Sequence, residues 1–143
     1  MGKCDVVQNI ISRKRILFLF FMVISAVSLY SQATVTINVN WRRYAEENLI
    51  QIRNAANTVL YQHCVPGNCF VSNNADIQNY TNSDNIVLGY GEYTVVVADR
   101  FPDSWNGFGS NATILVDGVQ VLNVTKSNDG GFTETFTFTI TAP

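Results

Sequence analysis

Charged side chains are scarce in this chain of 143 residues, which has nine lysines and arginines, eleven aspartates and glutamates, and a single histidine. The shortage of basic residues argues against nucleic acid or an anionic membrane as a partner, because both need a positive patch. With one histidine and no G-x-S-x-G or metalloprotease motif, only carboxylate pairs are left as candidate catalytic groups. We therefore expect a protein that is not an enzyme.

Residues 1–33 have the composition of a secretory signal peptide. Basic residues precede an uncharged apolar run at 16–30, and Ser31 and Ala33 place small residues at the −3 and −1 positions of a cleavage site near Ala33. The run is shorter than the roughly 20 residues that a membrane-spanning helix needs, which favours a cleaved signal over an uncleaved anchor. Cleavage would leave 34–143 as a single domain with five basic and ten acidic side chains. We expect it to be secreted or held at the cell surface, with no membrane contact after cleavage.

Cysteine is also scarce, and its placement fits an exported protein. Cys4 would leave with the signal, so that Cys64 and Cys69 remain in the stretch CVPGNC. An even pair at this short separation in an oxidising compartment predicts one disulfide that closes a small loop. A zinc site is disfavoured, because His63 is the only histidine that could join the two thiolates.

The rest of the chain lacks a convincing helical pattern and is dominated by alternation of apolar and polar residues, which is typical of β-strands. The segment RRYAEENLIQIRNAA has helix-like charges, but Ile50 and Ile52 alternate with polar neighbours and favour a strand. Residues 63–84 are aperiodic and predict a long surface loop. The expected strands cover 34–41, 48–54, 58–62, 85–89, 92–99, 112–118, 119–125 and 133–141.

Turn residues separate these strands and complete the fold prediction. Asp117-Gly118 is a strong signal for a two-residue type I′ hairpin, while NAAN at 54–57 and NDGG at 128–131 mark further turns. About eight short strands without a helix predict an antiparallel β-sandwich of jelly-roll or immunoglobulin-like kind.

The connection at 99–110, DRFPDSWNGFGS, is longer than the roughly two to five residues that reverse a hairpin. Its oxygen-bearing side chains, Asp99, Asp103 and Asn106, are of the kind that Ca²⁺ binds, and its proline and glycines let the backbone fold back. The same side chains also suit a loop closed by Asx-turns, so both interpretations stay open. A catalytic role for Asp99 and Asp103 as the carboxylate pair of a glycosidase is disfavoured, because the domain is small for a cleft around a sugar polymer.

A series of residues in and around this loop forms a recognisable motif: Tyr93-Thr94-Val95, Asp99, Phe101, Asp103, Trp105-Asn106-Gly107, ILVDGVQV at 114–121 and GGFTETFTF at 130–138. The series resembles a β-sandwich module of exported bacterial proteins that has a DSYGDGWNG loop after a YTL-type strand. The resemblance covers 85–141 well and 34–62 loosely, and Pro102 and Ser104 stand where that module has glycines. It implies an accessory or adhesive module of the cell exterior, associated with calcium.

The expected partner is an extracellular polysaccharide or a surface protein. Tyr90, Trp105 and Phe108 are candidate ligand-binding aromatics, which would make the domain a carbohydrate-binding module, although Trp105 also suits a plug over one end of the sandwich. A structural subunit of an extracellular assembly is a further alternative. Three N-x-[ST] sequons, at Asn79, Asn111 and Asn123, would accept glycans in a eukaryotic secretory pathway, whereas the bacterial resemblance favours chance occurrence.

Overall fold

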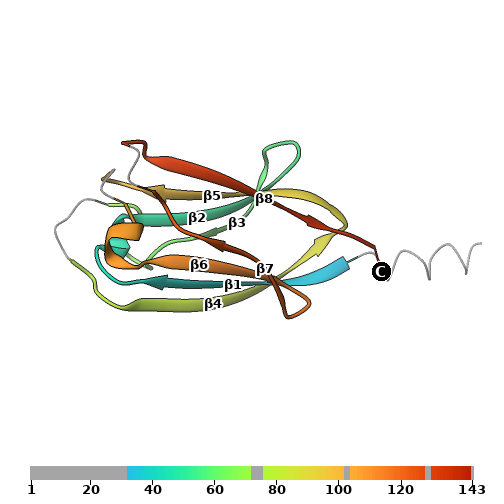
Figure 1. Cartoon of the computed structure of the whole chain (residues 1–143), viewed down its shortest axis with the longest axis horizontal. Helices are drawn as coiled ribbons and strands as arrows, with labels where there is room; N and C mark the ends of the chain where they lie inside the picture. Colours follow the sequence, from blue (N-terminus) through green and yellow to red (C-terminus); the bar gives the residue numbers. More distant parts are fainter. Residues whose placement is uncertain (1–31, 72–75, 102–103, 128–129, 143) are drawn as a thin grey trace, which may run out of the picture. The chain divides into compact units, whose positions relative to one another are not determined.

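Two four-stranded antiparallel sheets pack face to face, which confirms the predicted eight-stranded β-sandwich (Figure 1). The computed structural model describes residues 32–71, 76–101, 104–127 and 130–142, without the side chain of Asn106. The chain divides into the units Met1–Gln32 and Ala33–Pro143, and the second contains the fold. The strands are β1 (Gln32–Trp41), β2 (Asn48–Asn54), β3 (Val59–His63), β4 (Tyr80–Gly89), β5 (Gly91–Asp99), β6 (Asn111–Val116), β7 (Val119–Val124) and β8 (Thr133–Ile140).

The strand order places long-range partners side by side. One sheet has the order β4-β1-β6-β7 and the other has the order β3-β2-β5-β8. In the second sheet β5 lies between β2 and β8, and the residues from Val95 to Asp99 are all buried. Val96 and Ala98 are buried as well as Val95 and Val97, so both faces of this segment are covered and it needs no polar alternation.

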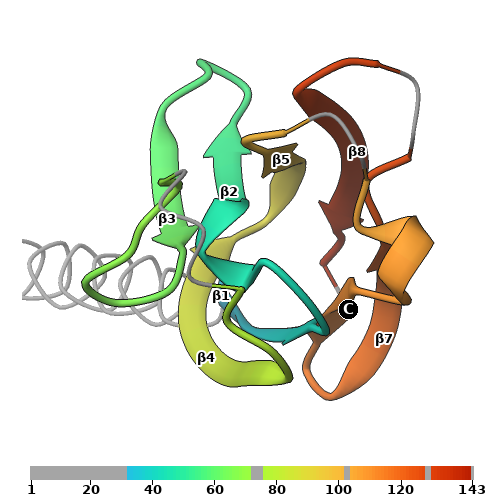
Figure 2. The ribbon, with the colours of Figure 1, turned by 90° about the vertical axis from the view of Figure 1, so that its left-hand side faces the viewer.

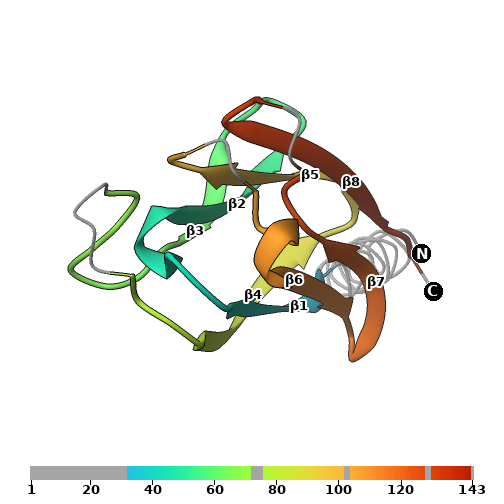
Figure 3. The ribbon, with the colours of Figure 1, turned by 60° about the vertical axis from the view of Figure 1, so that its left-hand side comes forward.

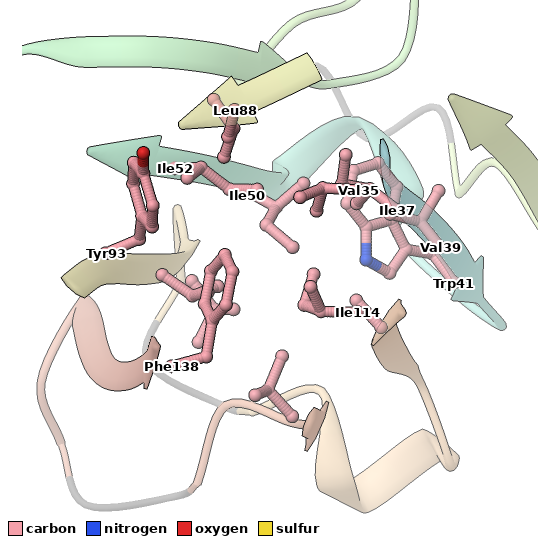
Figure 4. Packing of buried hydrophobic residues seen from close by; sticks show 14 of the residues in the cluster. Val35, Ile37, Val39, Trp41, Ile50, Ile52, Leu88, Tyr93, Ile114 and Phe138 are labelled. Atoms are coloured by element: carbon pink, nitrogen blue, oxygen red, sulfur yellow. The ribbon is translucent and has the colours of Figure 1, made fainter. Parts of the chain in front are cut away.

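The core lies between the sheets and is built from the inward residue of each alternating pair (Figure 4). In β1 every second side chain from Ala33 to Trp41 is buried, while those between them are exposed or half-buried. Ile50 and Ile52 of β2 and Ile114 of β6 reach the same core and are fully buried. Period-two patterning was sufficient to predict these inward faces, because successive strand residues point to opposite sides.

The two ends of the sandwich differ in the kind of connection that they carry (Figures 1 and 2). One end, here called the turn end, has the short reversals β2–β3, β4–β5 and β6–β7. The predicted turn at Asp117-Gly118 is present, with φ of 48° and 82° at its two residues. The other end, here called the loop end, carries the long connections, including 99–110.

Three details differ from the sequence predictions. A loop was predicted at 63–84, but β4 begins at Tyr80 and β3 ends at His63. The last five residues of the predicted loop and its first residue therefore belong to strands. Polar residues occupy both faces of that part of β4, which hid the alternation. Residues Ala45–Glu47 form a 3₁₀ turn, η1, before β2. β1 begins at Gln32, so the expected cleavage near Ala33 falls within its first residues.

Candidate functional site

A small cavity lies at the loop end, where the η1 segment meets the 99–110 connection. Its volume is about 10 Å³, about the size needed for one water molecule or ion. Its buried lining comes from Glu47, Asn48, Asp99, Ser104 and Trp105, and its more exposed lining comes from Arg43, Tyr44 and Phe108.

Strand pairing brings two carboxylates to this cavity. β2 and β5 are antiparallel, and their register places Asn48 opposite Asp99. The backbone N–H of Arg100 donates to the carbonyl of Glu47 at 2.9 Å, which fixes the end of η1 beside β5. Glu47 is 5% exposed and Asp99 is 3% exposed. Asp99 is a site residue that the sequence predicts. Glu47 and Asn48 were not predicted, although the acidic pair Glu46-Glu47 directly before a strand was a usable signal.

The 99–110 connection is closed by its own hydrogen bonds. One carboxylate oxygen of Asp99 accepts from the backbone N–H of Phe101 at 3.1 Å, as in an Asx-turn. The carbonyl of Trp105 accepts from the N–H groups of Phe108 and Ser110, around the 3₁₀ turn η2 (Asn106–Phe108) that precedes β6 in Figure 3.

Ser104 has a left-handed backbone conformation, with φ of 83°. A non-glycine residue in this conformation stores strain of about 1–3 kcal/mol. The buried Ser104 hydroxyl compensates in part, because it accepts from the N–H of Gly107 at 3.2 Å. The connection is therefore held in a shape that its own sequence does not favour.

Trp105 is the buried centre of the loop end. Its ring is 1% exposed and makes an edge contact with Trp41, with 5.6 Å between the ring centroids. Trp105 therefore occupies the place of a plug over the core. Phe108, 36% exposed, lies at the loop end, whereas Tyr90, 37% exposed, lies in the β4–β5 turn at the turn end. The three predicted ligand-binding aromatics thus share no surface.

The exposed edge of the cavity is formed by a cation–π group that sequence reasoning missed. The Arg43 guanidinium lies 4.6 Å from the ring centroid of Tyr44 and 5.3 Å from that of Phe108. It also forms an ion pair with Asp76 at 2.8 Å, and this hydrogen-bonded partner lowers the pKa of the Asp76 carboxyl. Tyr44 is held in a left-handed conformation, with φ of 48°.

The remaining predicted cation ligands are only partly placed. Asp103 lies outside the described residues, and of Asn106 only the backbone is described, at the start of η2. Within the described part of the chain, no group of three or more histidine, cysteine, aspartate or glutamate side chains converges as a metal site would require.

A second polar cluster lies between the edge strands β3 and β4. His63 Nε2 is 3.0 Å from the Tyr80 hydroxyl, and His63 Nδ1 is 3.3 Å from the Asp84 carboxylate. The Tyr61 hydroxyl donates to the same carboxylate at 2.8 Å, which lowers the pKa of Asp84. Burial lowers the pKa of His63, and this effect outweighs the opposing attraction of Asp84. The ring of Trp41 lies 5.7 Å from that of His63, so the cluster continues into the core.

The predicted disulfide between Cys64 and Cys69 is present, with 5.0 Å between the two Cα atoms. The chain after it docks on η1, because the N–H of Val71 donates to the carbonyl of Glu46 at 3.0 Å. The N–H of Ile77 donates to the Glu46 carboxylate at the same distance. The disulfide loop therefore belongs to the loop end.

Comparison with known proteins gave no match to a family model, to a curated protein or to a solved structure. None of the helices in the described part of the chain is long and apolar enough to cross a membrane.

Proposed function

We propose that residues 34–143 form a secreted, non-catalytic binding or adhesion module whose loop end is stabilised by Ca²⁺. One observation supports a bound cation: Glu47 and Asp99, both nearly fully buried, line the same ion-sized cavity. Two buried acidic residues beside one ion-sized cavity offer the carboxylate oxygens that Ca²⁺ binds.

The groups around the cavity suit a hard cation. Calcium takes six to eight oxygen ligands, among them carboxylates, amide carbonyls and backbone carbonyls, in flexible geometry. Asp99 and Glu47 would provide charge, and Asn48 and Ser104 would provide neutral oxygens from the same lining. Asp103 and Asn106 remain ligands predicted from the sequence alone. Arg43 also lines the cavity, but its charge is matched by Asp76.

The disulfide supports the proposed location. Stable disulfides form in oxidising compartments such as the cell exterior and are rare in the cytosol. The Cys64–Cys69 bridge therefore agrees with export by the signal at 1–33. The module that the chain resembles, found in exported bacterial proteins, points to the same location.

A thermal melt in millimolar calcium, compared with a melt in chelator, tests the cation. A ligand that binds only the native state, at about 100 times its Kd, adds about 2.7 kcal/mol to the free energy of unfolding. With an unfolding entropy of about 2.1 cal/mol/K per residue, a domain of this size gains roughly ten degrees in Tm. Equal melting temperatures in calcium and chelator would refute calcium binding.

Two matched variants locate the site. Glu47→Gln replaces a carboxylate with an amide of the same shape, so we expect the calcium shift in Tm to be lost. Glu92→Gln changes an exposed carboxylate near the turn end and should keep the full shift. A full shift in Glu47→Gln would mean that calcium binds at another place.

A further inference from the structure

A second and larger hollow lies on the outside of the β4-β1-β6-β7 sheet, where the 99–110 connection enters β6 and β7 ends. Its volume is about 300 Å³, and it is lined by Gly109, Ser110, Asn111, Asn123, Val124 and Thr125. This volume is at the lower end of the range of about 300–1,000 Å³ for small-molecule sites, which suits a ligand about the size of one sugar ring.

Side-chain amides at this hollow are held in place by hydrogen bonds across three strands. Asn40 Nδ2 donates to Asn111 Oδ1 at 3.4 Å, and Asn111 Nδ2 donates to Asn123 Oδ1 at 2.9 Å. Beside them, the Thr125 hydroxyl donates to the carbonyl of Ser110 at 2.9 Å. The polar groups are therefore oriented before a ligand arrives, which lowers the entropic cost of binding.

The outer face of the β4-β1-β6-β7 sheet continues from the hollow. None of its described outward residues is charged. Charged residues make up 14% of the chain, and none of them lies at these positions. The face also lacks aromatic side chains, which are enriched at protein–protein interfaces. Its outward positions are Gln32, Thr34, Thr36, Asn38 and Asn40 of β1, Thr81, Ser83, Asn85 and Val87 of β4, Asn111, Thr113 and Leu115 of β6, and Gln120, Val121 and Asn123 of β7.

We propose that the hollow at Asn111 and Asn123 binds a neutral sugar unit of a polysaccharide. A primary amide offers an acceptor and two donors in one plane, and a sugar hydroxyl is both donor and acceptor, so amides at neighbouring strand positions match neighbouring hydroxyls. The Thr125 hydroxyl adds a third polar group. The absence of lysine and arginine from the face disfavours acidic polysaccharides, and its neutral polar surface can accept further units of the chain along β1 and β4.

The inference rests on the proposed role as an extracellular binding module, but it requires neither calcium nor the loop aromatics. Without an aromatic platform for stacking, we expect weak binding by each site, with a Kd on the order of millimolar. Binding should be insensitive to salt, because no counterion is displaced from an uncharged face.

Affinity electrophoresis tests the proposal with the full chain, expressed and purified as its host cell processes it. The gels contain one soluble polysaccharide each, from a neutral set (starch, laminarin, mannan, xylan) or an acidic set (alginate, polygalacturonate). We expect retardation by at least one neutral polymer, in calcium and in chelator. Retardation by the acidic polymers alone, or by none of the panel, would overturn the proposal.

Two variants assign the retardation to the hollow. Asn123→Ala should weaken it at least tenfold, while Gln62→Ala, which removes an exposed amide on the outward face of the other sheet, should leave it unchanged. Equal retardation of Asn123→Ala and the parent would overturn the assignment. A cooperative thermal melt of Asn123→Ala in chelator shows that the variant is folded, and its calcium shift in Tm reports separately on the cation site.

Discussion

Replacing Trp105 by alanine should remove the plug that holds the 99–110 connection over the core. The ring is 1% exposed and contacts Trp41 edge-on. The same residue anchors the backbone, because its carbonyl accepts from Ser110 and Phe108. The substitution leaves those carbonyl bonds in place, so the loss measures the ring.

The expected cost follows from the burial. Deleting a fully buried tryptophan side chain costs about 3–5 kcal/mol through lost transfer energy and the cavity that remains. With the unfolding entropy of a domain of about 110 residues, this lowers Tm by roughly 13–22 °C. Within the described residues the Trp105 indole N–H has no hydrogen-bond partner, so Trp105→Phe also removes an unsatisfied donor worth about 1–3 kcal/mol. We therefore expect Trp105→Phe to cost well under half as much as Trp105→Ala.

Melts followed by circular dichroism, in chelator so that a cation makes no contribution, measure these differences. Phe108→Ala is the matched control, since that ring belongs to the same loop but is 36% exposed, and we expect it to cost about 1 kcal/mol. If Trp105→Ala cost no more than Phe108→Ala, Trp105 would not be a core residue, and the interpretation of the loop as a plug would be wrong.

Two other predictions concern the edge cluster and the disulfide. Burial lowers the pKa of His63 below its ordinary value, so near pH 6 the unfolded chain binds more protons than the folded chain does. The free energy of unfolding should therefore fall as the pH drops below about 6.5 and level off below the folded-state pKa. Urea titrations between pH 7.5 and 5 should show this pH dependence of the free energy of unfolding in the parent and a weaker dependence in His63→Gln. Equal pH dependence in the two proteins would contradict the prediction. Asp84, whose pKa is also lowered, titrates below this pH range. For the disulfide, the paired Cys64→Ser and Cys69→Ser substitutions should cost about 2 kcal/mol by loop entropy, with no free thiol in the denatured, unreduced parent. Two titratable thiols in that sample would show that the bridge is not formed.

The sequence alone determined the strands and several of the turns. Alternation in β1 and β8, the Asp117-Gly118 hairpin and the short separation of Cys64 and Cys69 are local properties, since each depends on residues that are close in the chain. The local sequence also identified the unusual 99–110 connection and Asp99 within it. The strand prediction failed at the start of β4, because the inward residues Asn82 and Asp84 are polar there and contact His63 of the neighbouring edge strand.

Only the tertiary structure decided which side chains share a site. Glu47 and Asn48 reach Asp99 because of the β2–β5 register, about fifty positions apart in sequence. Asn40, Asn111 and Asn123 meet because β6 lies between β1 and β7. Tyr90 and Phe108, which composition alone placed together, lie at opposite ends of the domain because β5 runs the length of the sandwich between them. Register and strand order arise from packing the whole core, so no local sequence pattern encodes which of these side chains lie together.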